Sequence, residues 1–352
     1  MSLERYLDSD FGSVESGLAL GTLPNEGHVE WWRRRASGDG APVEDLVRAL
    51  PQFRVPVVRD ASSTEIYRRL VLAGESDDPD AEPIERIFRQ PEGVQVSIQE
   101  HPAGDLPVLE FADRSDFERG VRALGSRCEP VAISPSVHAL YVSGLPNSVR
   151  ASELRNSWFE QGGDPAAWSE ETKRLRAADP TVFHDRMILL HSAPYAGIPA
   201  MRVEPSLDEV GWTEKSRVLR LEHEFTHHAT HRILGSYRLH VHDEFLADLM
   251  GFTKSIGRWD ADLFLLGLGI EGGRIRPDAR LQAYVAKLDP NDLADLIPII
   301  ERIARNLESI AELYLVDDPP VRLRRLVRLA GEDLRTMMNP EWPEAFLTRD
   351  PA

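Results

Sequence analysis

Cysteine is the scarcest residue in this chain, because Cys128 is the only one among 352 residues. A single thiol excludes an internal disulfide framework and a zinc cluster built from cysteines. We expect Cys128 to be a small buried apolar residue rather than a nucleophile.

Long apolar runs are also missing. No segment approaches the ~18 consecutive apolar residues that a membrane-spanning helix needs. The N-terminal residues MSLER lack the basic-then-apolar order of a signal peptide. These absences predict a protein with no membrane partner, and a cytoplasmic location is the default expectation.

Basic charge is in deficit. The chain has 41 Lys and Arg against 58 Asp and Glu, which gives a net charge of −17. A surface this acidic disfavours nucleic acid and anionic membrane as general partners. We interpret the local cluster of Arg322, Arg324, Arg325 and Arg328 as the solvated face of a helix with a buried leucine stripe.

Two enzyme signatures are absent or misplaced. The chain has no G-x-S-x-G elbow, which argues against a serine hydrolase. Residues 267–272 match G-x-G-x-x-G, but they follow a predicted helix instead of a strand, so we interpret them as a loop and not a dinucleotide site. We expect the adjacent Trp31 and Trp32 to pack in a core or an interface.

What the sequence does contain is enough apolar character for a packed core, at 42% hydrophobic residues. Over residues 1–200 short strand and helix signals alternate. They predict strands over residues 94–98, 108–111, 137–142 and 187–190, and helices over residues 43–50, 64–73 and 115–124. We therefore expect an α+β lobe over residues 1–200 with an antiparallel or mixed sheet.

The remaining residues, 201–352, predict a mainly helical lobe. Apolar residues at helical spacing indicate one helix over residues 214–234, which Gly235 ends, and another over residues 243–256, with Asp243 as its N-cap. Further helices are expected over residues 261–268, 278–288, 291–315 and 320–337. We expect the two lobes to form one unit, with the functional site at their interface.

The most informative segment reads H-E-x-x-H, from His223 to His227. A helix advances ~100° and ~1.5 Å per residue, so the two His side chains lie ~40° apart around the axis and ~6 Å apart along it. Both imidazoles can therefore converge on one metal ion. Glu224 lies beside the metal, where it can hold a water molecule and act as a base.

A zinc site of this kind needs a third protein ligand and an open fourth position. Glu244, near the start of the next predicted helix, is our candidate. Asp248 lies one helical turn further on the same face and can accept the free N–H of a ligand His. The third His of a metzincin would stand at Ile233, so that class is excluded.

Other side chains compete for these roles. At His231 the helix has risen ~12 Å and turned ~80° from His223, so a surface or supporting position is favoured. His228 points ~100° away from His227. His240, His242 and Asp243 flank Glu244 and remain alternative ligands.

The parts imply a mechanism. The metal lowers the pKa of a bound water to about 7, and Glu224 takes its proton and later delivers it to the leaving group. A further donor would stabilise the oxyanion. The candidates are His242, Tyr237, Arg280 and Tyr284, although a structural role is favoured for each. Of these, we predict only His242 as a second catalytic residue.

Residues 220–227 (RLEHEFTH) with residues 243–248 (DEFLAD) resemble the gluzincin clan of metallopeptidases. In that clan two His and a downstream Glu bind zinc, the motif Glu is the base, and a later Asp supports a ligand His. The resemblance implies a zincin-like fold, one zinc ion, and these roles for His223, His227, Glu244, Glu224 and Asp248.

Beyond these segments the chain resembles a bacterial family of unknown function, which implies no substrate. The shared phrases are residues 19–24, 64–67, 223–251, 272–275 and 280–284.

Three functions follow from the pattern. The first is a zinc-dependent hydrolase that acts on a peptide or amide bond. The second is a biosynthetic tailoring enzyme, a lyase or non-peptide hydrolase, that uses the same metal site on a small molecule. The third is a non-catalytic, metal-stabilised interaction protein, which would have a fourth protein ligand. Iron, cobalt or manganese can also occupy such a site, and the sequence predicts no oligomeric state.

Overall fold

The computed structural model describes residues 1–8, 11, 21–36, 43–75, 80–83, 86–235 and 238–349. The chain forms two compact units. The helical unit comprises Met1–Leu23, Ser134–His138 and Ser192–Ala352, and the sheet unit comprises Pro24–Ile133 and Ala139–His191. Tyr237 and part of the first family phrase, residues 19 and 20, lie outside the described residues.

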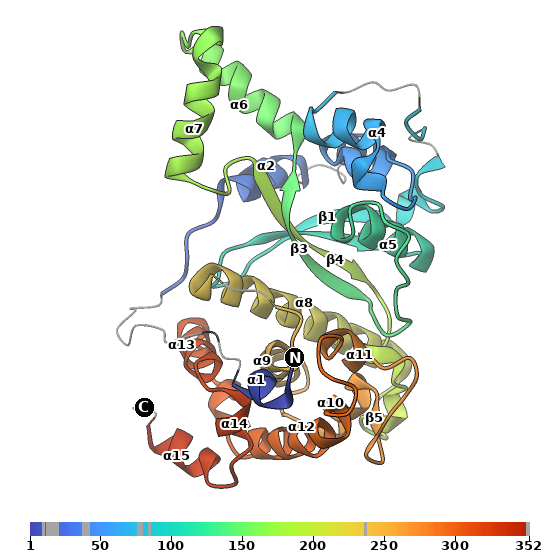
Figure 1. Ribbon diagram of the computed structural model, residues 1–352, viewed down its shortest axis with the longest axis vertical. Coiled ribbons are helices and arrows are strands. Elements are labelled where there is room, and N and C mark those ends of the chain that lie inside the picture. The colour runs from blue at the N-terminus through green and yellow to red at the C-terminus, as the bar shows by residue number, and fades with distance from the viewer. Residues whose placement is uncertain are drawn as a thin grey trace. The chain divides into compact units, whose positions relative to one another are not determined.

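A mixed four-stranded sheet is the centre of the sheet unit (Figure 1), with the strand order β1-β2-β4-β3. The strands are β1 Val94–Gln99, β2 Leu106–Phe111, β3 Ala139–Pro146 and β4 His184–His191. β1 and β2 form an antiparallel hairpin, β2 runs parallel to β4, and β3 runs antiparallel to β4. The predicted hairpin and mixed sheet are confirmed.

Burial along the strands follows their place in the sheet. β2 and β4 are central and apolar, with Val108, Leu109, Ile188 and Leu189 almost completely buried. At the edge, β1 alternates between buried and exposed residues at its start. Continuous burial is what a strand covered on both faces requires.

Short helices surround this sheet, and α2 and α5 pack on its strands. They are α2 Gly27–Ala36, α3 Val43–Ala49, α4 Glu65–Tyr67, α5 Arg114–Gly120, α6 Ser148–Glu160 and α7 Trp168–Ala178, and the π-helical turns Arg68–Leu72 and Val121–Gly125 extend α4 and α5. Trp31 and Trp32 are buried, with ring centroids 4.9 Å apart, as predicted. Cys128 is buried too, and burial raises the pKa of its thiol to about 12.

A buried carboxylate, Asp185, organises one end of the sheet unit. It accepts hydrogen bonds from Trp32 Nε1 at 2.8 Å and Asn147 Nδ2 at 2.8 Å. Arg150 Nε donates to its other oxygen at 2.8 Å. Because every partner belongs to the same unit, this network fixes α2, α6 and β4 to one another.

The helical unit contains the other described α-helices (Figure 1). They are α1 Leu3–Leu7, α8 Glu209–Leu234, α9 Val241–Ser255, α10 Ala261–Leu268, α11 Leu281–Tyr284, α12 Leu293–Glu308, α13 Pro319–Ala330, α14 Leu334–Met337 and α15 Trp342–Thr348. α8 and α9 pack along each other closely enough that a Cβ on Gly251 would lie 2.7 Å from the carbonyl oxygen of Leu219.

Helix caps explain where the predicted boundaries of α8 and α9 were wrong. α8 begins earlier than expected because the Asp208 side chain accepts a hydrogen bond from Gly211 N. It ends, as predicted, at Gly235, whose φ is 67°. Asp243 is not the N-cap of α9, since His240 accepts from His242 N and holds that position.

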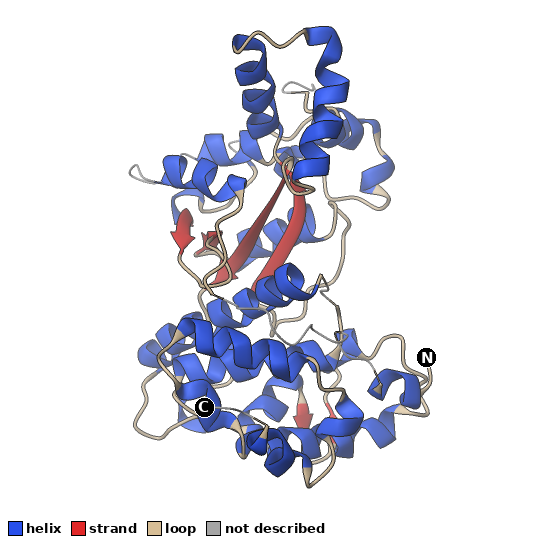
Figure 2. Ribbon diagram, turned by 90° about the vertical axis from the view of Figure 1, so that its left-hand side faces the viewer, coloured by secondary structure: helices blue, strands red, loops and turns tan. Residues whose placement is uncertain are grey.

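Downstream segments also differ from the expectation. Residues 267–272 are not a simple loop, because they include the end of α10 and its C-cap, Gly269. The chain then continues into a two-stranded antiparallel ribbon of β5 Ile270–Glu271 and β6 Arg274–Ile275 (Figure 2). The long helix predicted over residues 320–337 is broken, because Asp333 caps a separate α14. Arg322 is buried and paired with Glu222, so it does not belong to a solvated face.

Candidate metal centre

α8 and α9 bring the three predicted ligands together. His223 and His227 come from α8 and Glu244 from the first turn of α9, and their ligand atoms all lie within 4.8 Å of one another. The Nε2 atoms of the two His lie 3.1 Å apart, and each is 3.6 Å from a Glu244 carboxylate oxygen. All three side chains are buried.

The donor set fits a tetrahedral zinc ion. Ligand atoms ~2.0–2.1 Å from zinc and at tetrahedral angles are about 3.3–3.4 Å from one another. The two Nε2 atoms are 3.1 Å apart, and each is 3.6 Å from a different oxygen of Glu244, so the separations are near that value. Glu244 Oε2 is buried and accepts no hydrogen bond from any described residue, which is costly unless a cation faces it.

Asp248 supports the cluster from behind. It is completely buried, and its Oδ1 lies 2.7 Å from His223 Nδ1. A carboxylate at this position holds the ring proton on Nδ1, which leaves the Nε2 lone pair directed at the other ligands. Tyr195 donates its hydroxyl to Oδ2 at 2.8 Å, and Arg280 donates to the same oxygen.

The charges of this group are coupled. Burial raises the pKa of Asp248, but the charges of Arg280 and His223 outweigh it and hold that pKa below its usual range. Burial likewise opposes charge on His223, yet Asp248 raises the His223 pKa to about 9. The pKa of His227 is well below its usual value because of burial and the neighbouring His223. Asp248 therefore stabilises the proton on Nδ1 of His223 and fixes the orientation of this ring.

The candidate base, Glu224, follows His223 on α8 and is buried. Its charge lies close enough to raise the pKa of His223. His242, the second candidate catalytic residue, is completely buried in the first turn of α9. Its Nδ1 lies 3.4 Å from an Arg238 nitrogen, and its ring is 5.5 Å from that of Phe11. These neighbours favour a structural role for His242.

The alternative ligands occupy other positions. His240 stacks on Tyr6, with ring centroids 4.0 Å apart, and caps α9. Asp243 forms an ion pair with Arg238 at 3.1 Å. Neither these residues nor His231 joins the potential ligand group found within the part of the chain that the structure describes.

Two supporting residues were not predicted in their observed roles. Arg280 was weighed as an oxyanion donor, but its guanidinium binds Asp248 and lies 3.8 Å from Glu244 Oε2. Tyr195 was not considered, because nothing in the sequence spacing connects it to the motif. Tyr284 lies beside Glu244, and burial together with the Glu244 charge raises its pKa.

Fold and site together define an α+β protein with a buried His/His/Glu group on two packed helices. The chain belongs to the family of unknown function DUF7005, which it matches over residues 1–341. No curated protein and no solved structure matches it. The predicted membership of a family of unknown function is confirmed, and the gluzincin resemblance stays a hypothesis. Among the described residues, no helix has both the length and the apolar character to cross a lipid bilayer.

Proposed function

We propose that this protein is a metal-dependent hydrolase of gluzincin type that uses one zinc ion and acts on a peptide or amide carbonyl. The observation that carries the proposal is the convergence of His223, His227 and Glu244, with Asp248 orienting the first ring. A zincin-like arrangement of the fold belongs to this proposal. Among the described residues no fourth His, Cys, Asp or Glu joins the group, which favours an open position over a closed structural site.

Each residue of the site has a separate role in the proposed reaction. When bound, zinc supplies Lewis acidity: it lowers the pKa of water at the site to about 7 and polarises a carbonyl oxygen. Glu224 takes a proton from the attacking water and gives it to the departing nitrogen, so one C–O bond forms and one C–N bond breaks. Asp248 keeps His223 in one tautomer throughout. Arg280 neutralises the Asp248 carboxylate, which keeps the buried charge compensated.

A second candidate is the modification of a small molecule at the same site. Burial of the three ligands and of Glu224 favours it, since each is less than a tenth exposed. An extended polypeptide substrate needs an accessible groove, whereas a small molecule can be enclosed.

Glu224→Gln tests the proposed base. The variant should keep its metal and lose turnover by at least about 100-fold, because the carboxamide cannot accept the proton. Turnover is followed by mass spectrometry after incubation with a peptide library and, separately, with a metabolite extract. Glu214→Gln, an exposed position on the same helix, is the matched control and should behave like the wild type. Undiminished turnover of Glu224→Gln would remove that residue as the base.

A further inference from the structure

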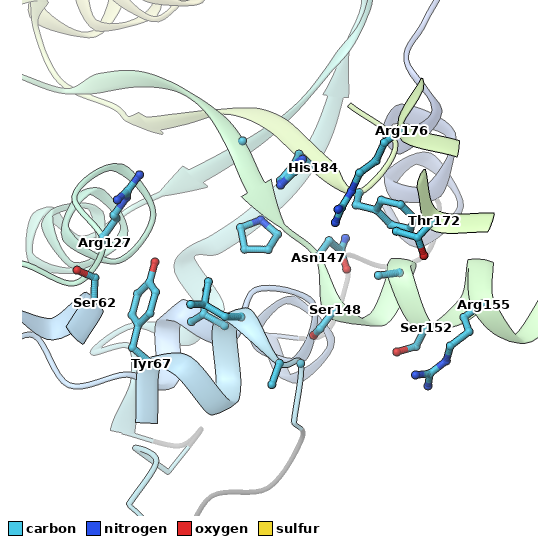
Figure 3. Close-up of a pocket in the computed structure, with 18 of the residues that line it drawn as sticks. Ser62, Tyr67, Arg127, Asn147, Ser148, Ser152, Arg155, Thr172, Arg176 and His184 are labelled. Carbon is cyan, nitrogen blue, oxygen red and sulfur yellow. The ribbon is translucent and has the colours of Figure 1, made fainter. Parts of the chain in front are cut away.

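The sheet unit contains a cavity that is separate in its residues from the metal centre. It has a volume of ≈ 710 Å³ and is lined by α4 and the turn after it, the ends of β3 and β4, α6 and α7 (Figure 3). Binding sites for small molecules have volumes of about 300–1,000 Å³. The cavity is therefore too large for a lone inorganic ion and suits a small organic molecule.

Its lining is cationic in a chain that is strongly acidic. Among the described residues, the cavity is lined by Arg127, Arg155 and Arg176 together with His184, and by no Asp or Glu. Throughout the described part of the chain, no carboxylate forms an ion pair with any of these three arginines. Arg174, which is on the same helix as Arg176 (α7) but outside the cavity, does have a carboxylate partner: it pairs with Glu171 at 2.6 Å. Arginine forks match the oxygens of a phosphate or carboxylate group.

Hydroxyl groups without protein partners add donors. Tyr67 is only 7% exposed, yet its hydroxyl makes no hydrogen bond with a described residue. Figure 3 shows this hydroxyl directed toward Arg127 and Ser62, across the cavity from Arg155 and Arg176. The hydroxyls of three lining serines also make no hydrogen bond within the described residues: Ser62, Ser148 and Ser152. Such groups can donate to an anion on either side of the cavity.

The first turn of α6 adds a further positive feature. Asn147 caps this helix of 13 residues by accepting from Arg150 N, and Ser148 begins it. Both residues line the cavity. The N-terminal end of a helix presents free N–H groups and the positive end of the helix dipole, which together attract an anion.

An apolar portion completes the lining. Trp168 and Phe183 meet edge to face with ring centroids 6.4 Å apart, and Val71 and Pro146 line the cavity with them. Arg176 lies over the Phe183 ring, 5.3 Å from its centroid. Aromatic and aliphatic surface beside clustered donors suits a ligand that has a flat ring as well as a charged group.

We propose that this cavity binds a small organic anion that carries a phosphate group and a flat ring, as a mononucleotide does. A phosphate ester carries about −1.5 to −2 charge at neutral pH and offers three acceptor oxygens, which match arginines that lack carboxylate partners. A nucleic acid polymer fits less well, since the net charge of −17 would repel a long polyanion. The site is independent of the proposed hydrolase activity, because none of its residues belongs to the metal centre.

Calorimetric titration of the full-length protein with ADP at low salt tests the proposal. Arg155→Ala and Arg176→Ala should each weaken ADP binding by about tenfold, and salt should weaken it in the wild type. Arg174→Ala removes an exposed charge from the same helix but outside the cavity, and it should bind ADP like the wild type. Arg176→Lys keeps the positive charge but loses the forked guanidinium, so its affinity for ADP should lie between those of the wild type and Arg176→Ala.

Three further probes separate the parts of the ligand. Adenosine, which lacks phosphate, should bind far more weakly than ADP, and pyrophosphate should compete with ADP for the site. Citrate tests whether carboxylates serve equally well. The proposal is overturned if ADP does not bind, if citrate binds while ADP and pyrophosphate do not, or if Arg174→Ala weakens binding as much as Arg176→Ala. Circular dichroism of each variant distinguishes lost contacts from lost folding.

Discussion

Two groups of polar side chains, one in each unit, are compensated in opposite ways. In the helical unit His223 and Asp248 are buried, the Arg280 side chain is 11% exposed, and Asp248 contacts both of the other two. In the sheet unit Arg127 and Arg155 line a cavity with no carboxylate partner among the described residues. A buried charge has to be compensated by the protein itself, whereas an exposed one can stay uncompensated until a ligand arrives. The paired side chains of the helical unit hold the candidate site in one orientation. The unpaired arginines of the sheet unit leave positive charge available to a ligand.

Among the described residues, each unit also has one aspartate with no exposed surface. Asp185 binds Trp32, Asn147 and Arg150, which hold elements of the sheet unit together. Asp248 instead binds a proposed metal ligand. Both carboxylates should therefore stabilise the fold, but only Asp248 should affect metal binding. Substitutions in each unit test that distinction.

Asp248→Ala should have the largest effect. It leaves the Arg280 side chain, which is only 11% exposed, without its carboxylate partner, which costs about 3–5 kcal/mol of unfolding free energy. It also releases His223, so metal affinity should fall by about 10–100-fold. Urea unfolding and metal titration measure the two effects separately. Wild-type metal affinity in this variant would show that Asp248 does not orient the ligand.

Asp185→Ala is the counterpart in the sheet unit. Removal of this carboxylate leaves the buried Arg150 without its ion pair, so the loss of unfolding free energy should again be about 3–5 kcal/mol. Metal affinity per folded chain should equal that of the wild type. A parallel loss of metal would mean that the two buried aspartates do not have separate roles.

His28 should make the sheet unit sensitive to acid. It is buried, and burial lowers its pKa from 6.5 to about 4. Below pH 6.5 the unfolded chain binds a proton at His28 that the folded chain does not bind until about pH 4, so stability falls across that window. The shift corresponds to about 3 kcal/mol. Unfolding free energies of the wild type and His28→Asn should converge between pH 6.5 and pH 4, and parallel profiles would contradict this assignment.

Glycine replacements at helix ends should have the smallest effects, and similar ones in both units. Gly235 follows α8 with φ 67°, and Gly162 follows α6 with φ 90°. No atom lies within 4 Å of a Cβ built on either residue, so the cost is conformational only. Each change to Ala should cost about 1 kcal/mol in urea unfolding. A much larger loss at Gly235 would indicate that the end of α8 also positions the site.

The sequence predicted the His/His/Glu group because its members lie close together on two successive helices. His223 and His227 lie one turn apart on a single helix, and Glu244 and Asp248 lie one turn apart on the next, so helical periodicity relates each pair. The strands of the hairpin followed from alternation in the same way. The start of α8 was missed because its cap, Asp208, precedes the apolar pattern.

The supporting contacts could not be predicted, because they join distant segments. Tyr195 is 53 residues from Asp248 and Arg280 is 32, and no periodicity links residues so far apart. The lining of the cavity in the sheet unit also joins residues that are far apart in the sequence. Arg127, Arg155 and Arg176 come from three different segments, so only the folded chain shows that they share one lining.

The most direct test of the metal centre is the metal content of the purified protein, measured by mass spectrometry beside His223→Ala. His231→Ala, on the same helix but outside the ligand group, is the matched control. We predict one zinc ion per chain in the wild type and in His231→Ala, and none in His223→Ala. Equal zinc in all three proteins would contradict the assignment of the site.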